Sequence, residues 1–119
     1  MISDGKFHKR EHILKTRDFG TVYKKGLSVK NGPLVLCCMP NGLAHSRVGF
    51  SISSRNIKLA SRRNRIKRLL REAYRLNKDR ISGPADLIFI AKRPLPEDTA
   101  YEDVKAIFLK LIKSAGIRL

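Results

Sequence analysis

The chain is poor in the residues on which many protein classes depend. Its 119 residues include no tryptophan, two cysteines and only ten acidic residues, against 26 Lys and Arg. No run of about 18 apolar residues is present, which excludes a transmembrane helix, and positions 1–6 (M-I-S-D-G-K) lack the apolar core of a signal peptide. We therefore expect a cytoplasmic protein. The length fits one domain, residues 1–119, in which residues 1–13 form a flexible basic arm.

The two cysteines are neighbours, Cys37 and Cys38, within an apolar run. Successive residues of a strand point to opposite faces, so a disulfide between them would have poor geometry. The pattern predicts two reduced thiols.

Residues that could perform catalysis are also scarce. His8, His12 and His45 are scattered through polar segments, and the acidic residues are dispersed. His8 and His12 share the i, i+4 spacing of a helical metal site, but the two cations between them make a solvated arm the better interpretation. No glycine-rich phosphate loop is present. The residues predict a binding protein with no catalytic side chains and no metal site.

The chain has instead a large excess of positive charge. Its formal net charge of +16 far exceeds the roughly 2–8 charges that keep a small domain soluble. Positions 55–75 hold nine Lys or Arg, and Glu72 is their only acid. Like charges along a helix repel each other, and nucleic-acid phosphates are the commonest polyanion that offsets this repulsion. An anionic membrane surface is the second candidate, but no helix joins this charge to a face rich in Trp and Phe.

Hydrophobic periodicity predicts one α+β sandwich of order α-β-β-β-α-β-α. We expect helices at 16–25, 58–77 and 100–114, and strands at 27–29, 33–39, 47–53 and 86–91. Thr16 should cap the first helix, Gly26 should end it in the left-handed conformation, and Thr99 with Glu102 should form a capping box.

The long basic helix is predicted to be amphipathic. One stripe should face the core, and it comprises Leu59, Ile66, Leu69, Leu70, Ala73 and Leu76. The opposite side carries Asn64, Arg68, Arg71 and Arg75. Guanidinium groups there can bind phosphates with two hydrogen bonds and stack on bases. A solvated basic face without a ligand is the alternative.

A second candidate surface lies on the strand at 47–53, where alternation places Arg47, Ser51 and Ser53 on one face. If Phe19 and Tyr23 pack beside this face, they form a groove with aromatic walls, which suits single-stranded RNA. From spacing alone, plain core packing is the better interpretation of both aromatic residues.

Four segments resemble one known family. Positions 63–72 read R-N-R-I-K-R-L-L-R-E, which resembles the R-N-R helix of the protein subunit of bacterial ribonuclease P. The segments 18–26, 47–53 and 86–94 resemble the first helix, central strand and last strand of that family, in the same order. The resemblance covers about residues 14–112.

This resemblance implies a ribonucleoprotein endonuclease that removes the 5′ leader from precursor tRNA. In that family an RNA subunit performs the hydrolysis with Mg²⁺ held mainly by RNA, and the protein binds the leader. The implied partners are the RNA subunit, one per protein, and precursor tRNA, with no membrane and no small-molecule cofactor. The implied fold is ribosomal-protein-like with a left-handed β-α-β crossover, against the usual hand.

The family's site residues transfer to matching positions only. Contact with the RNA subunit is implied for Arg63, Asn64, Arg65, Lys67, Arg68 and Arg71, and Arg75 extends the same face. Leader contact is implied for Phe19, Tyr23, Ser51, Ser53, Arg55, Lys92 and Arg93, and Arg47 joins them from strand alternation.

The chain departs from the family pattern at two places. It has Ser54-Arg55 where many members have two basic residues, and Cys37 where an aromatic residue is frequent. Two other functions stay open: a ribosomal or RNA-chaperone protein that uses the same helix on other RNA, and a metal-dependent nuclease that acts alone.

Overall fold

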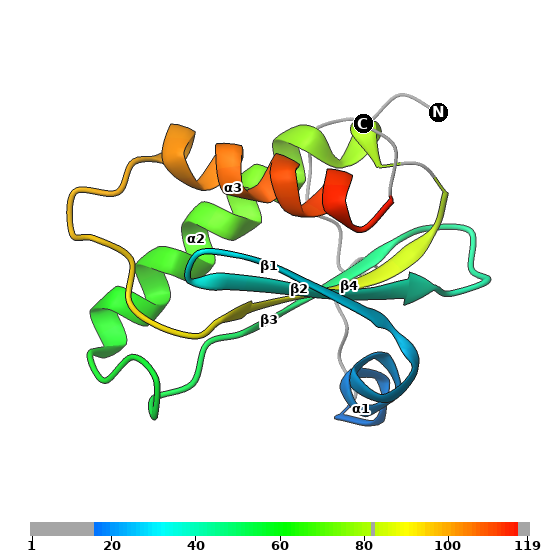
Figure 1. Ribbon diagram of the computed structural model, residues 1–119, viewed down its shortest axis with the longest axis horizontal. Coiled ribbons are helices and arrows are strands. Elements are labelled where there is room, and N and C mark those ends of the chain that lie inside the picture. Colours follow the sequence, from blue (N-terminus) through cyan, green and yellow to red (C-terminus); the bar gives the residue numbers. More distant parts are fainter. Residues whose placement is uncertain (1–15, 82, 117–119) are drawn as a thin grey trace.

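The computed structural model describes residues 16–81 and 83–116, so the predicted arm at 1–13 lies outside the described residues (Figure 1). The elements follow the predicted order, with one short 3-10 helix added. They are α1 (Thr16–Lys25), β1 (Leu27–Asn31), β2 (Leu34–Pro40), β3 (Arg47–Ser51), α2 (Ala60–Asn77), η2 (Lys78–Arg80), β4 (Ala85–Ala91) and α3 (Tyr101–Ser114). The predicted α+β class and element order are confirmed.

The four strands form one mixed sheet in the order β1-β2-β4-β3. β2 pairs antiparallel with both β1 and β4, whereas β3 pairs with β4 in parallel. Helices α2 and α3 cover one face of the sheet, and α1 lies against the other (Figure 1). The molecule therefore has three layers, with the basic helix α2 on the side opposite α1.

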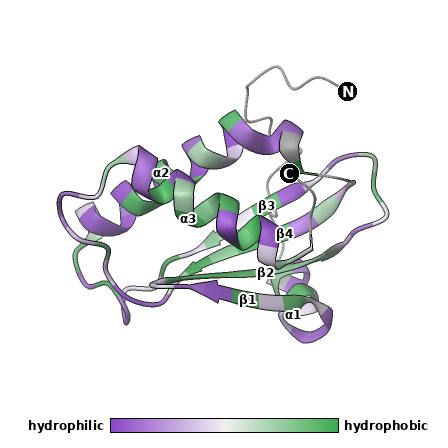
Figure 2. Cartoon of the chain, turned by 45° about the horizontal axis from the view of Figure 1, so that its top comes forward, coloured by the Kyte–Doolittle hydropathy of each residue, from purple (hydrophilic) through white to green (hydrophobic). Residues whose placement is uncertain are grey.

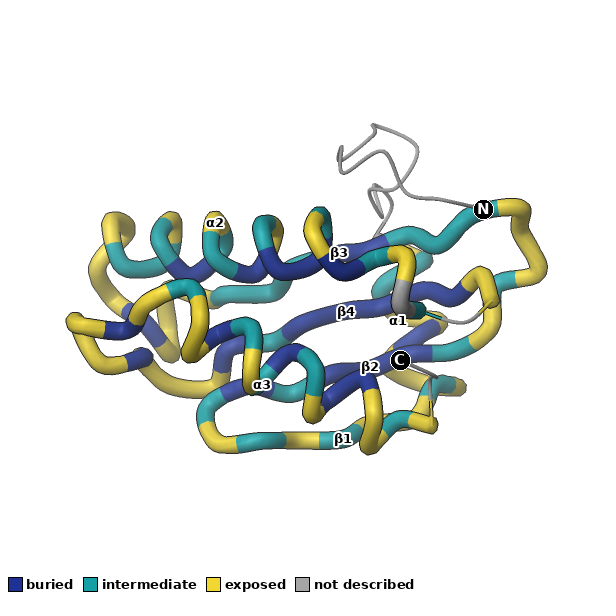
Figure 3. Tube along the Cα trace, turned by 90° about the horizontal axis from the view of Figure 1, so that it is seen from above, coloured by how far each residue is buried: buried dark blue, intermediate teal, exposed yellow. Residues whose placement is uncertain are grey.

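The connection from β3 through α2 to β4 is a crossover between parallel neighbours. Figure 3 views the sheet from the side of α2 and α3. In this view β4 lies below β3 and both strands run from right to left. When the view is turned so that the strands point upward, β4 therefore lies to the left of β3. A crossover in front of the sheet that moves to the left is left-handed, which is rare for β-α-β units. The hand agrees with the one that the family resemblance implied.

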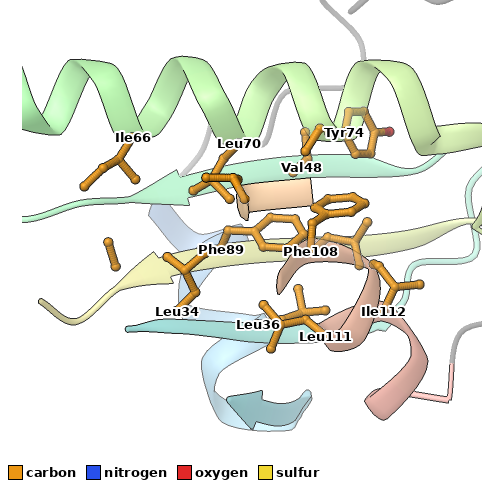
Figure 4. Packing of buried hydrophobic residues seen from close by; sticks show 14 of the residues in the cluster. Leu34, Leu36, Val48, Ile66, Leu70, Tyr74, Phe89, Phe108, Leu111 and Ile112 are labelled. Carbon is orange, nitrogen blue, oxygen red and sulfur yellow. The ribbon is translucent and has the colours of Figure 1, made fainter. Parts of the chain in front are cut away.

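The main core fills the space between the sheet and the two covering helices. Leu36 of β2 and Phe89 of β4 meet Leu70 of α2 and Phe108 of α3 there, all fully buried (Figure 4). The rings of Phe89 and Phe108 stack with centroids 5.1 Å apart. Alternation along β2 places Cys38 in this core and Cys37 on the α1 side. Both are free thiols, as predicted.

The buried stripe of α2 is rotated from the predicted one. Ile66, Leu70 and Ala73 are buried as expected, but Leu76 is 49% exposed. Leu59 is 59% exposed because it is the extended residue before the helix, which begins at Ala60. Tyr74 and Asn77 occupy the core side instead. The Asn77 side-chain amide donates to the carbonyl of Ala73 and to the hydroxyl of Tyr101, which makes its burial tolerable.

The predicted capping box of α3 is wrong by one residue. The helix begins at Tyr101, and Asp103 rather than Glu102 accepts a 2.9 Å hydrogen bond from the backbone N–H of Ala100. Thr99 is buried just before the helix. Ala100 has no side-chain oxygen, so only half of a capping box forms. The predicted cap at Thr16 involves a side chain outside the described ones.

Gly26 ends α1, but not in the predicted left-handed conformation, since the glycines with positive φ among the described residues are Gly32, Gly42, Gly83 and Gly116. Its N–H donates to the carbonyl of Val22 over 2.8 Å. A Cβ at Gly26 would lie 2.5 Å from that carbonyl oxygen and 2.8 Å from the carbonyl oxygen of Cys38. Close approach of two backbones, rather than conformation, requires glycine here.

Gly26→Ala is therefore expected to lower the free energy of unfolding by about 1–2 kcal/mol, because backbone atoms must shift. Urea denaturation followed by circular dichroism measures the loss. Gly20→Ala is the matched control, since a Cβ at this helix position meets nothing within 4 Å and alanine favours a helix. Equal stability of the Gly26 variant and the wild type would contradict the close approach.

Candidate nucleic-acid interface

The outer face of α2 is hydrophilic along much of its length, whereas β2 is mostly hydrophobic (Figure 2). Asn64, Arg68 and Arg71 are exposed on this face, and Lys67 is half-buried. Arg75, also half-buried, forms an ion pair with Glu72. Hydrogen bonding from Arg75 lowers the pKa of Glu72, so this acid stays ionised beside the basic face. The helix thus presents several cations and one paired acid to its surroundings.

The first arginines of α2 hold neighbouring segments in place. Arg63 donates from Nη1 to the carbonyls of Ile57 and Lys58, over 2.8 and 2.9 Å. Arg65 donates to the carbonyls of Glu97 and Thr99, over 2.6 and 2.5 Å. Both residues are predicted contacts of the RNA subunit, and in this structure their guanidinium groups contact backbone carbonyls. The structure therefore places Asn64, Lys67, Arg68, Arg71 and Arg75 on the outer face of α2. Arg63 and Arg65 lie in its first turns, where they bond to neighbouring segments.

A groove of about 720 Å³ lies on the α1 side of the sheet. Four of the predicted leader-binding residues line it: Tyr23, Ser51, Ser53 and Lys92. The other lining residues are Ser28, Val29, Lys30, Val35, Cys37, Asn56 and Ile90. Cys37 and Ile90 point to this side because they alternate with core residues of β2 and β4. The groove combines an apolar floor with hydroxyl, amide and ammonium groups.

Residues from β1 were missed by the sequence-based prediction of this groove. Lys30 pairs with Val35 and Ser28 pairs with Cys37 across the first hairpin. That register carries both polar residues onto the α1 side, where they line the groove. Alternation along 27–31 was the available signal, but the prediction assigned only 27–29 to a strand.

Phe19 and Tyr23 lie on the same side of α1 with ring centroids 6.3 Å apart, tilted by 56°. They differ in their surroundings. Tyr23 is 47% exposed at the groove, whereas Phe19 is half-buried against the small cluster of Val22, Cys37 and Ile88. A Cβ at Gly49 would lie 2.6 Å from the tip of the Phe19 ring. Glycine in β3 thus lets this ring rest directly on the sheet.

Arg47 lies on the α1 side as expected, but it does not line the groove. It donates from Nε and Nη2 to both carboxylate oxygens of Asp86, over 2.9 and 2.6 Å, and lies 3.5 Å from Asp18 of α1. The hydrogen bond to Asp86 raises the pKa of Arg47 above its usual value. Asn41 also donates to Asp86, over 2.9 Å. Leader contact by Arg47 remains a prediction, and the observed role is to join α1, β3 and β4.

The remaining predicted leader residues, Arg55 and Arg93, are exposed in the connections after β3 and β4 and do not line the groove. Lys92 is fixed by its backbone N–H, which donates to the carbonyl of Pro33 over 2.8 Å. The R-N-R helix lies on one face of the sheet, within a left-handed β-α-β unit, and the polar groove lies on the other face. This arrangement agrees with the resemblance drawn from the sequence. A model of the family described as Ribonuclease P matches residues 7–116.

The chain belongs to the ribonuclease P protein family. Among its relatives, the ribonuclease P protein component of Pelotomaculum thermopropionicum is 42% identical over 105 residues, which cover 88% of this chain and 92% of the relative. Membership of this family makes the chain a protein component of ribonuclease P, as the sequence predicted, and therefore part of a ribonuclease.

Solved structures of ribonuclease P proteins share the fold. The Staphylococcus aureus protein superposes with a TM-score of 0.80 at 33% identity, covering 92% of this chain and 98% of that one. The Thermotoga maritima protein gives a TM-score of 0.73 at 31% identity, covering 85% and 94%. These similarities extend over the sheet and its covering helices and support the whole architecture described above.

The family of this ribonuclease P protein implies Mg²⁺, an ion that binds carboxylate and other oxygen ligands. Asp18 and Asp86 approach the same point, but the Arg47 guanidinium lies between them. Within residues 16–81 and 83–116, no three His, Cys, Asp or Glu side chains cluster in a way that could hold a metal ion. The described carboxylates therefore do not fit a protein-bound Mg²⁺. Over the same residues, no helix is long and apolar enough to span a membrane.

Proposed function

We propose that this protein binds the RNA subunit of ribonuclease P through the outer face of α2 and the 5′ leader of precursor tRNA in the groove beside α1. The RNA subunit performs the hydrolysis, with Mg²⁺ held by RNA and substrate. One protein acts with each RNA subunit in the cytoplasm. The protein side chains contribute binding and orientation of the leader near the cleavage site.

The observation that carries this proposal is the position of the two surfaces on opposite faces of one sheet. Arg68 and Arg71 are exposed on α2, and the groove with Tyr23 and Lys92 opens on the α1 side. A protein with this arrangement can contact a folded RNA and a separate single strand at the same time. Phosphate contacts by Arg and Lys supply most of the affinity of such complexes.

The lining of the groove suits an unpaired strand. Lys30 and Lys92 both line it and can each meet a phosphate. The half-exposed ring of Tyr23 offers a stacking surface for one base. Ser51, Ser53 and other hydroxyl groups can bond to ribose 2′-OH groups and base edges. These groups bind without demanding a particular sequence, as removal of different leaders requires.

The decisive experiment is reconstitution. Purified protein alone should leave precursor tRNA intact at any Mg²⁺ concentration. Protein together with the RNA subunit should cleave at low Mg²⁺, where the RNA subunit alone is slow. Cleavage by protein alone would favour a metal-dependent protein nuclease, and failure to stimulate the RNA subunit would favour a ribosomal or RNA-chaperone role.

Tyr23→Ala is expected to weaken binding of leader-bearing precursor tRNA to the reconstituted enzyme by about 2 kcal/mol, the value of one aromatic stacking surface, because this ring is 47% exposed at the groove. Binding of mature tRNA should change little, because it has no leader. Equilibrium filter binding of both ligands measures the difference. Equal losses for the two ligands would show that the Tyr23 ring does not contact the leader and only packs beside Phe19.

A further inference from the structure

A second hollow, of about 360 Å³, lies between the first turns of α2 and the segment that leads from β4 to α3. It is separate from the groove, since α2 covers the opposite face of the sheet. We refer to it as the arginine pocket. Its rim and floor are formed chiefly by Arg62, Arg65, Arg68, Ile66, Leu69 and Leu95.

The floor of the arginine pocket is apolar. Ile66 and Leu95 are 4% and 8% exposed, and Leu69 packs against the main core. A phosphate placed on such a floor would lose hydration, and two of the three arginines around it, Arg62 and Arg65, already bond to Glu97 and Thr99. A flat aromatic base would gain contact area there, because its faces are apolar and its edges polar. The floor therefore favours a base over a phosphate.

The rim is already ordered for a planar ligand. Arg65 is held by the carbonyls of Glu97 and Thr99, and Arg62 pairs with the Glu97 carboxylate. Guanidinium groups fixed in this way present flat faces on which a base can stack at little entropic cost. The Glu97 carboxylate on the same rim also opposes a phosphate inside the pocket.

Arg68 links this pocket to the outer face of α2. It lines the pocket and is exposed beside Asn64 and Arg71. An RNA backbone that follows the outer face would place a phosphate on Arg68. The base attached to that nucleotide could then turn into the pocket.

We propose that the arginine pocket receives one unstacked base of the RNA subunit, while the adjacent phosphate binds Arg68. This inference rests on the proposed binding of the RNA subunit to α2 and adds a contact to a base at that surface. The leader is not the occupant, because its groove lies on the other face of the sheet.

The test is Leu69→Gln, which keeps the size of the side chain and the net charge but makes the floor polar. We expect the affinity for the RNA subunit to fall about tenfold, because a polar floor removes apolar contact that stabilises the bound base. The salt dependence should stay unchanged, because the variant still neutralises the same phosphates. Leu76→Gln is the matched control, since Leu76 is a leucine of the same helix outside the pocket, and it should bind within twofold of the wild type.

Chemical probing of the RNA subunit with dimethyl sulfate gives an independent measurement. One reactive nucleotide of the free RNA should become protected by the wild-type protein and by Leu76→Gln, and exposed again with Leu69→Gln. The proposed base-binding role of the pocket is overturned if Leu69→Gln binds the RNA subunit with wild-type affinity or if Leu76→Gln loses as much affinity as Leu69→Gln. It is also overturned if the wild-type protein protects no base. If Leu69→Gln and Arg68→Ala both bind the RNA subunit as tightly as the wild type, the proposed function of α2 is overturned as well. Thermal unfolding measurements verify that each variant is folded. If Leu69→Gln does not fold, the presence or absence of a protected base with the wild-type protein decides whether the pocket binds a base.

Discussion

Asp86→Ala should lower the free energy of unfolding by about 3 kcal/mol, the lower end of the range for removing one partner of a buried ion pair. The Asp86 side chain is only 7% exposed and accepts from Arg47 and Asn41. Its removal leaves the Arg47 guanidinium, 23% exposed, without its main partner. Urea unfolding at neutral pH measures the loss.

Glu97→Ala provides the matched control. It also removes a carboxylate that pairs with an arginine, Arg62, but Glu97 is 78% exposed, and a solvated pair contributes less than about 1 kcal/mol. The backbone carbonyl that Arg65 contacts is retained in this variant. Similar losses in the two variants would show that burial of Asp86 does not strengthen its ion pair.

The same ion pair connects stability to the leader groove. Arg47 contacts Asp86 of β4 and approaches Asp18, the residue before Phe19 in α1. Loss of Asp86 leaves the Arg47 side chain without its contact on β4, so the link from the sheet to Asp18 of α1 becomes looser. The Asp86→Ala enzyme should therefore discriminate less between precursor and mature tRNA even at temperatures where it is fully folded. Unchanged discrimination between precursor and mature tRNA would show that Arg47 and Asp86 only stabilise the fold.

The ion pair illustrates a limit of sequence-based prediction. Alternation placed Arg47 correctly on the face shared with Ser51, because period 2 is a local property of a strand. Its partner Asp86 is 39 residues away and is directly opposite only because β3 and β4 pair in parallel with Arg47 aligned to Asp86. Register between distant strands is set by the whole core, so Arg47 could be assigned to a face but not to a partner.

The elements themselves were largely predictable, because each has strong local periodicity. The errors lie where tertiary packing overrides it. Leu76 is hydrophobic and on the edge of the predicted stripe, yet the larger Tyr74 and the hydrogen-bonded Asn77 occupy the core. Gly26 was assigned the usual helix-ending conformation, whereas the close approach of β2 explains it. The left-handed crossover came from the family resemblance alone, since no local pattern encodes a hand.

For the candidate site, the sequence predicted which residues belong to the two surfaces better than it predicted the contacts that each residue makes. The R-N-R segment does form a helix with an exposed basic side, but Arg63 and Arg65 are engaged with backbone carbonyls. These bonds join residues in different elements and leave no trace in spacing. Conversely, Lys30 reaches the groove only through the β1–β2 register.

Arg68→Ala combined with Arg71→Ala should weaken binding of the RNA subunit about 100-fold, roughly 3 kcal/mol for the removal of two charge-assisted hydrogen bonds to phosphate. Both side chains are exposed on the outer face of α2, so the fold should be little affected. The plot of log affinity against log salt concentration should also flatten by roughly 0.9 for each phosphate that the protein no longer neutralises. Filter binding at several KCl concentrations measures both quantities.

Lys110→Ala combined with Lys113→Ala removes two charges from α3, where Lys110 and Lys113 are also exposed, and so keeps the net charge equal to that of the arginine variant. If α2 is the docking face, the lysine variant should bind the RNA subunit within a few fold of the wild type and with a nearly unchanged salt slope. Equal weakening in both variants would mean that total charge, rather than the α2 face, attracts the RNA. An unaltered slope in the arginine variant would remove Arg68 and Arg71 from the interface, because the release of counterions depends on how many phosphates the protein neutralises.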